Sequence, residues 1–69
     1  MTDTVRLEAL MLESGLKRAY IAESLGISEN SLRNKVANRT EFKPSEINKI
    51  CKLLGIKTMT DRQAIFFAK

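Results

Sequence analysis

The chain has 69 residues, of which 43% are hydrophobic and 29% charged, with a net charge of +4, one cysteine and no histidine. This composition is typical of one small globular domain, and it excludes a disordered chain, an internal disulfide and a zinc site of histidine and cysteine. A domain this small buries only about 60% of its unfolded surface, so packed helices or a partner subunit must stabilise it.

Five helices and no strands are predicted, because apolar residues recur at three- and four-residue spacing and nothing alternates with period two. The first helix is expected from about Thr4 to Ser14, with Asp3 as its N-cap and Gly15 as its end. Its inward face is expected to consist of Leu7, Leu10 and Met11.

The second and third helices are expected at about residues 17–25 and 29–38, joined by the turn Gly26-Ile27-Ser28. Gly26 supplies a positive φ at the turn, and Ser28 is a good N-cap for the third helix. The apolar residues expected to hold both helices against the core are Ile21, Ala22, Leu25, Ile27, Leu32 and Val36.

The fourth helix is expected to begin at Pro44, which suits a first helical position, and to end before Gly55. A short fifth helix is expected at about residues 61–67, because Thr60 and Gln63 have the spacing of a capping box. The core stripe of the fourth helix is expected to consist of Ile47, Ile50, Cys51 and Leu54.

The most informative stretch is residues 18–38. Two helices joined by a turn of three to four residues that contains a glycine cross at a steep angle, as in a helix-turn-helix. Ala22 is small where the third helix is expected to cross above it. The remaining side chains of the third helix are then expected to face outward.

The segment RAYIAESLGISENSLRNKV at residues 18–36 resembles the Cro and repressor type of phage helix-turn-helix. The resemblance covers nearly the whole chain, including Leu16, Glu41-Phe42 and the closing Ile65-Phe66-Phe67. It implies an all-α, five-helix domain like that of lambda repressor. It also implies a phage or prophage regulator that binds double-stranded DNA sequence-specifically, with the third helix in the major groove.

By this resemblance, the residues that read base edges are Glu29, Asn30, Ser31, Arg33 and Asn34. The expected phosphate contacts are Lys17, Arg18, Ser28, Lys35, Asn38, Arg39 and Lys43. Arg18 stands where the family commonly has glutamine, and Lys17 where a small capping hydroxyl is usual. Glu29 and Ser28 also have structural interpretations, since an acid suits the first helical turn and a serine suits the N-cap.

The charge distribution favours the same interpretation independently. Residues 1–16 have a net charge of −2, whereas residues 17–57 carry nine basic and four acidic side chains, for +5. The positive charge therefore belongs to the motif and its surroundings, as a DNA-binding protein requires.

The C-terminal residues Ile65, Phe66 and Phe67 present more apolar surface than the expected core needs, since adjacent helical residues point about 100° apart. We therefore expect the last helix to form part of a homodimer or repressor-binding interface, with Phe66 or Phe67 inserted in the partner. Homodimers on inverted half-sites are the common arrangement for such readers. Chains truncated after Arg62 should then stay helical and lose self-association.

An enzyme is not expected, because histidine is absent and the three glycines lie too far apart for a phosphate-binding loop. No cofactor, metal or small-molecule effector is indicated. The N-terminus lacks the apolar core of a signal peptide and no run approaches a membrane span, so a cytoplasmic protein is expected. The alternative function is a helix-turn-helix fold that binds protein, as a modulator of a partner repressor.

Overall fold

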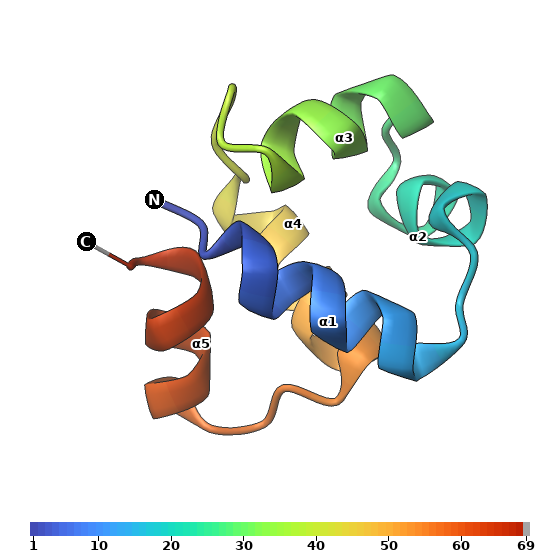
Figure 1. The fold of residues 1–69 in the computed structure, drawn as a ribbon. Coiled ribbons are helices and arrows are strands. Elements are labelled where there is room, and N and C mark those ends of the chain that lie inside the picture. Colours follow the sequence, from blue (N-terminus) through green and yellow to red (C-terminus); the bar gives the residue numbers. More distant parts are fainter. Residues whose placement is uncertain (69) are drawn as a thin grey trace.

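Five helices make up the chain in the computed structural model, which describes residues 1–68 (Figure 1). No strand occurs among these residues, so the all-α prediction is confirmed. In chain order the helices are α1 (Thr4–Ser14), α2 (Arg18–Leu25), α3 (Glu29–Val36), α4 (Pro44–Leu54) and α5 (Met59–Phe66).

Local capping signals set most of the helix ends. The Asp3 carboxylate accepts a hydrogen bond from the Arg6 N–H at 3.1 Å and caps α1, as predicted. Ser28 caps α3 in the same way, because its hydroxyl accepts from the Ser31 N–H at 3.0 Å. Helices α1 and α4 begin and end at the expected residues.

Three helices differ from their expected bounds. Helix α2 begins at Arg18, one residue late, because Lys17 is its N-cap residue. Helix α3 ends at Val36, two residues early, because Asn38 takes up the left-handed conformation with φ of 66°. Helix α5 begins two residues early, because the Thr58 hydroxyl accepts from the Asp61 N–H at 3.1 Å and acts as its N-cap. The proposed cap at Thr60 was therefore wrong.

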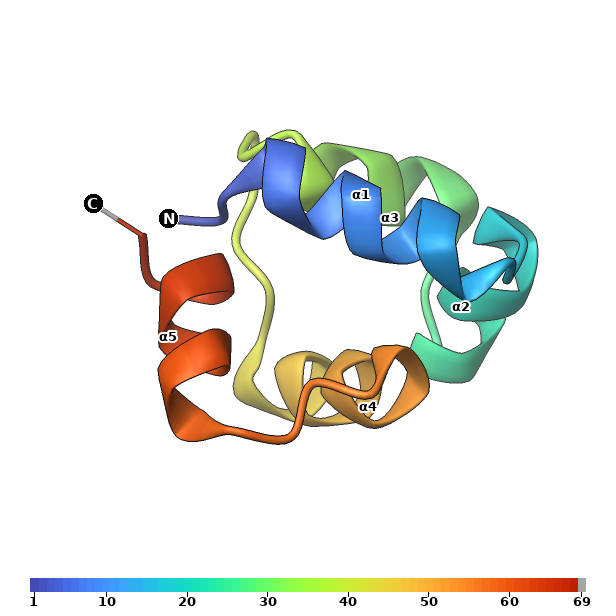
Figure 2. The same cartoon turned by 60° about the horizontal axis from the view of Figure 1, so that its bottom comes forward.

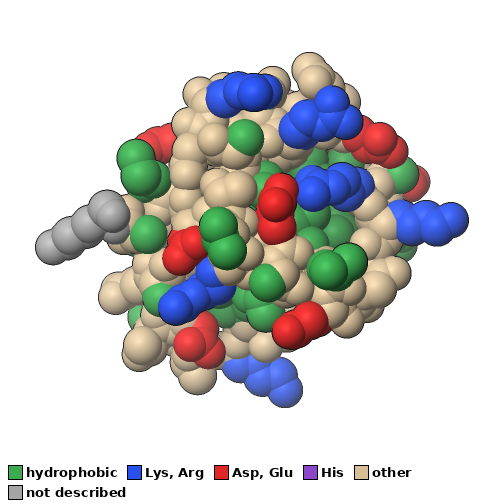
Figure 3. All heavy atoms as spheres, viewed as in Figure 1, with side chains coloured by type: hydrophobic (Ala, Val, Ile, Leu, Met, Phe, Trp, Pro, Cys, Tyr) green, Lys and Arg blue, Asp and Glu red, His purple; other side chains and the backbone are tan. Residues whose placement is uncertain are grey.

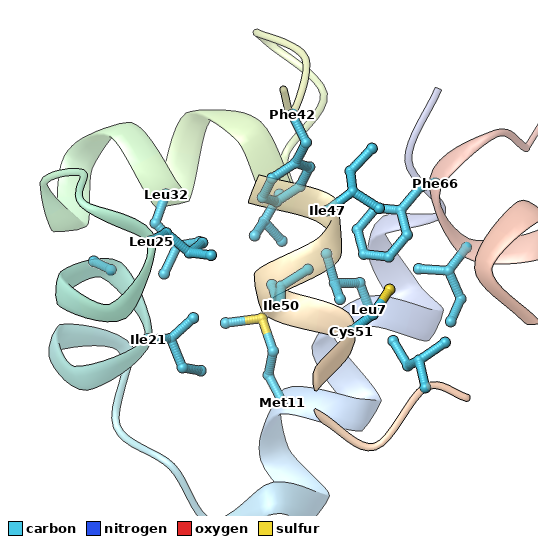
Figure 4. Packing of buried hydrophobic residues seen from close by; sticks show 14 residues of the cluster. Leu7, Met11, Ile21, Leu25, Leu32, Phe42, Ile47, Ile50, Cys51 and Phe66 are labelled. Atoms are coloured by element: carbon cyan, nitrogen blue, oxygen red, sulfur yellow. The ribbon is translucent and has the colours of Figure 1, made fainter. Parts of the chain in front are cut away.

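The helices surround one core. Figure 2 shows α1 and α3 side by side above α4, with α2 at one end of the molecule and α5 at the other. The side chains that fill the space between them are drawn in Figure 4. The buried hydrophobic residues are Leu7, Met11, Ile21, Ala22, Leu25, Leu32, Val36, Phe42, Ile47, Ile50, Cys51, Ile56, Ile65 and Phe66.

The C-terminal helix belongs to this core. Ile65 is 2% exposed and Phe66 is 4% exposed. The Phe66 ring packs edge-to-face on the Phe42 ring, with ring centroids 5.5 Å apart. The expectation that Ile65 and Phe66 serve a partner was therefore wrong, because α1 to α4 leave the side of the core next to Phe42 for α5 to close. Phe67 remains 58% exposed.

The N-terminal residues join α5 to the end of α3. The Asp3 N–H donates to the Ile65 carbonyl at 2.6 Å, and the Ala68 N–H donates to the Met1 carbonyl at 2.8 Å. Thr2, between them, is buried and hydrogen bonds to the side chain of Asn38. Residues far apart in the chain are thus tied together beside the third helix.

Replacing Ala22 by leucine should lower the free energy of unfolding by about 1–3 kcal/mol, because Ala22 is 2% exposed in the core beside α3 and extra methylenes overpack it. A shift of about 4–8 °C in Tm per kcal/mol is expected for a domain of this size. Ala19→Leu on the exposed side of α2 is the matched control and should change Tm little. Equal melting temperatures for the two variants would show that nothing crowds Ala22.

Candidate nucleic-acid interface

Helices α2 and α3 are joined by a tight turn. Gly26 closes α2 with φ of 74°, and the Ile27 N–H donates to the Ala22 carbonyl at 3.0 Å. A Cβ at Gly26 would meet no atom within 4 Å, so the positive φ, and not lack of space, favours glycine there. The turn brings α3 against α2 and leaves its other side at the surface.

Helix α3 has one buried and one polar side. Leu32, Lys35 and Val36 are buried. With a rotation of about 100° per residue, Asn30 and Asn34 stand opposite the buried side and are flanked by Arg33 and Ser31. Asn30 and Arg33 are exposed, and Ser31 and Asn34 are partly exposed. Four of the five predicted base-reading residues therefore share one outward surface, which we call the reading face: Asn30, Ser31, Arg33 and Asn34.

The start of α3 is occupied by capping interactions. The Ser28 hydroxyl is engaged with the Ser31 N–H, so its role as a cap is confirmed. Glu29 is exposed in the first turn, about 60° from the centre of the buried side, and lies at the edge of the reading face. An acid at this place is also stabilised by the helix dipole.

The loop after α3 adds a cation to the reading face. The Arg39 guanidinium donates to the Asn34 Oδ1 at 3.2 Å, and the Arg39 N–H donates to the Asn34 carbonyl at 2.9 Å. Arg39 therefore lies beside Asn34 and leaves the Asn34 Nδ2 free to donate outward.

The start of α2 carries two further cations. Lys17 is the N-cap residue of α2, in an extended conformation and without a side-chain capping bond. The Arg18 guanidinium lies 3.4 Å from the Glu8 carboxylate, and both side chains are about half exposed. Exposed pairs of this kind contribute about 0–1 kcal/mol, so a phosphate can displace Glu8 at little cost.

Lys35 does not face outward, and its expected phosphate contact was wrong. The residue is 8% exposed. Its Nζ lies 3.1 Å from the Glu46 Oε1 and donates to the Glu41 carbonyl at 3.1 Å. Position 35 neighbours Leu32 and Val36 on the buried side of α3, and this could have been read from the helical period. The ion pair with Glu46 could not be predicted in this way, because Glu46 lies on another helix.

Glu46 completes a buried network at the start of α4. Its Oε1 also accepts from the Lys43 N–H at 2.9 Å. Burial alone raises the pKa of Glu46, but the Lys43 N–H and the Lys35 ammonium more than offset this effect, so the pKa lies below its ordinary value of 4.5. The buried side chains of Lys35 and Glu46, with the Glu41 carbonyl and the Lys43 N–H that they bind, are called the buried lysine network.

Asn38 also has a different role from the expected one. Its Oδ1 accepts from the Thr2 N–H at 2.7 Å, and its Nδ2 donates to the Thr2 carbonyl. Both ends of the amide are therefore used on the N-terminal segment, and the expected phosphate contact was wrong. Its left-handed conformation is one that asparagine tolerates better than most residues.

Positive charge gathers around the reading face. Lys and Arg side chains stand over the upper edge of the molecule, where α3 and the following loop lie, and others stand at the right and in the lower part, where acidic side chains lie near them (Figure 3). Within residues 1–68, the charged groups of Lys17, Arg33 and Lys43 form no ion pair. These groups are thus available to a polyanion.

Other chemistry finds little support in the described residues. No group of three His, Cys, Asp or Glu side chains among residues 1–68 could hold a metal ion. Cys51 is free and buried, and burial raises the pKa of its thiol despite the nearby Arg62. No helix in this part of the chain is long and apolar enough to span a membrane.

Comparison with known proteins agrees with this geometry. Residues 6–61 match the family model described as the Cro/C1-type HTH DNA-binding domain. This match spans all of α2 to α4 and most of α1. No curated protein and no solved structure matches the chain significantly.

Proposed function

The chain belongs to the Cro/C1-type HTH DNA-binding domain family, and from this we propose that it is a sequence-specific regulator of transcription that binds double-stranded DNA with α3 in the major groove. The observation that carries the proposal is the two-sided α3, whose apolar side is buried while its polar reading face is open to solvent.

The reading face offers the side chains that major-groove recognition uses. Arg33 suits the O6 and N7 of guanine, and Asn30 suits the N6 and N7 of adenine. Asn34, with its Oδ1 engaged by Arg39, presents a donor to acceptors such as the N7 of a purine. Ser31 can donate or accept, and Glu29 can accept from cytosine at the edge of the face.

Phosphate contacts are proposed around this face. Lys17 and Arg18 lie at the N-terminal end of α2. In this class of motif, that end of the helix approaches the DNA backbone. Arg39 and Lys43 lie in the loop on the other side of α3. Ser28 contributes through the start of α3, where N–H groups and the helix dipole favour an anion.

Regulation follows from occupancy. A domain bound at an operator excludes polymerase or a rival repressor, and we propose that this phage- or prophage-type regulator acts in the bacterial cytoplasm by that route. One α3 reads few base pairs, so we propose a homodimer on inverted half-sites. Phe67, exposed beside an open groove of about 460 Å³ that Phe42, Pro44 and Met59 also line, is the remaining candidate for the dimer contact.

Replacing Arg33 by alanine should relax the preference at one base position and weaken binding to the preferred site by about 1–3 kcal/mol. Selection of bound sequences from a random duplex library identifies that site and shows the relaxed position. Lys43→Ala is the comparison variant, because loss of a phosphate contact weakens all sequences alike and reduces the slope of log affinity against log salt by about 0.9. Equal, sequence-independent losses for both variants would show that Arg33 does not read bases.

The second candidate function is a protein-binding modulator of a partner repressor. The exposed Phe67 and Met59 favour it, since large apolar side chains gathered on a surface often mark a protein contact. The two functions differ in their response to salt. Affinity for duplex DNA that falls steeply with salt supports the DNA reader, whereas tight binding to a repressor without DNA retention supports the modulator.

A further inference from the structure

The buried lysine network joins α3 to the loop at residues 37–43 and to α4. We propose that Lys35 is a positioning residue for DNA recognition: it holds the base-reading side chains at a set distance from the phosphate-contacting cations, without touching DNA itself. This inference rests on the proposed function and adds to it the residue that determines how well sequences are distinguished.

Lys35 is placed to do this by its contacts. Its predecessors Arg33 and Asn34 point into the reading face, while its own ammonium turns inward to the Glu46 carboxylate and the Glu41 carbonyl, both at 3.1 Å. Its side chain is 10% exposed and that of Glu46 is 8% exposed. The ammonium therefore links the last turn of the reading helix to two separate segments.

The loop that carries the phosphate-contacting cations is held at successive residues. The Glu41 carbonyl accepts from Lys35, the Phe42 ring lies in the core against Phe66, and the Lys43 N–H donates to Glu46. At its other end, the Arg39 N–H donates to the Asn34 carbonyl at 2.9 Å. The backbone that carries Lys43 is thus held by Lys35 and Glu46, and the backbone of Arg39 is held by Asn34 of the reading helix.

This arrangement affects specific and non-specific binding differently. Non-specific binding depends on charge, and the free cations at Lys17, Arg33, Arg39 and Lys43 remain when Lys35 is replaced. Specific binding requires that the protein contacts base edges and phosphates at the same time, so the distance between the two sets of side chains must be fixed. An apolar residue can replace a buried ion pair without loss of stability, but it cannot supply the directed hydrogen bonds that set this distance.

The test uses the double variant Lys35→Met/Glu46→Gln, which removes both charges and keeps an oxygen for the Lys43 N–H. Circular dichroism and melting establish that the variant is folded at the binding temperature. Affinity is then measured over a range of salt for the duplex selected by the unmodified protein and for a scrambled duplex. We expect the affinity for the selected duplex to fall about five- to tenfold, within the discrimination that one base pair contributes. The affinity for the scrambled duplex should change by less than about twofold, with an unchanged salt slope.

Glu46→Gln alone is the second variant, because it keeps the bonds from Lys35 to Glu41 and from Lys43 to position 46. It should give a smaller loss in the same direction, and it serves if the double variant does not fold. A folded variant with an unchanged ratio of specific to non-specific affinity overturns the proposal. A salt slope reduced by about 0.9 also overturns it, because Lys35 would then contact phosphate. An unmodified protein that selects no sequence overturns the proposed function itself.

Discussion

Replacing Phe66 by alanine is expected to lower the free energy of unfolding by about 3–5 kcal/mol, which is a large part of the stability of a domain this small. Phe66 is 4% exposed and packs edge-to-face on Phe42, so truncation leaves a cavity at the junction of α5 with the loop before α4. The N-terminal residues Met1–Asp3 hydrogen bond to α5 and the residues after it, and they lose this support as well. Urea unfolding followed by circular dichroism measures the change.

Phe67→Ala is the matched control, because the neighbouring phenylalanine is 58% exposed. It should change the free energy of unfolding by less than about 0.5 kcal/mol. For the same reason, truncation after Arg62 is now expected to unfold the chain, since it removes Ile65 and Phe66 from the core. A Phe66→Ala protein as stable as the Phe67→Ala protein would show that α5 does not close the core.

Replacing Lys35 by methionine is expected to destabilise the domain by about 3–5 kcal/mol at neutral pH, because it leaves the Glu46 carboxylate buried without its cation. Restoring neutrality with Glu46→Gln in the same chain should recover most of this loss. Arg33→Met, two residues earlier on the exposed side of α3, is the control and should cost little. If the Lys35→Met and Arg33→Met proteins unfold at the same urea concentration, the ion pair is not buried in solution.

Lowering the pH should reduce the difference in free energy of unfolding between the unmodified protein and Lys35→Met. In the unmodified protein the pKa of Glu46 is lowered, so its ionised form contributes stability that is present above the ordinary value of 4.5 and is lost as the pH falls below it. In Lys35→Met the lowering of the Glu46 pKa by Lys35 is gone, while burial still raises this pKa and Lys43 still lowers it. The pKa of Glu46 is therefore higher than in the unmodified protein, and protonation relieves the unpaired charge at a higher pH. The stability difference between the two proteins should therefore narrow as the pH falls from 7 towards 4. Urea midpoints at several pH values test this.

Local signals in the sequence were sufficient for most of the fold. Caps such as Asp3 and Ser28 and stops such as Gly26 act through hydrogen bonds and φ angles within a few residues, so they can be recognised without knowledge of the tertiary structure. The apolar period predicted the buried sides of α1 to α4 for the same reason. These elements predicted the helix-turn-helix, and the resemblance of residues 18–36 to Cro and repressor proteins predicted the family that the comparison shows.

The wrong cap at Thr60 was a local error, but the functional residues that were assigned wrongly have partners in distant segments. Lys35 needed Glu46 on α4, Asn38 needed Thr2 at the N-terminus, and Phe66 needed Phe42 in a loop. A basic or amide side chain on a helix looks like a ligand-binding group until its intramolecular partner is known, because both uses draw on the same donors and charges. The sequence by itself thus determined which helices form and which face of α3 is polar. Only the tertiary structure decided which polar groups stay exposed at the surface and which are engaged in contacts within the domain.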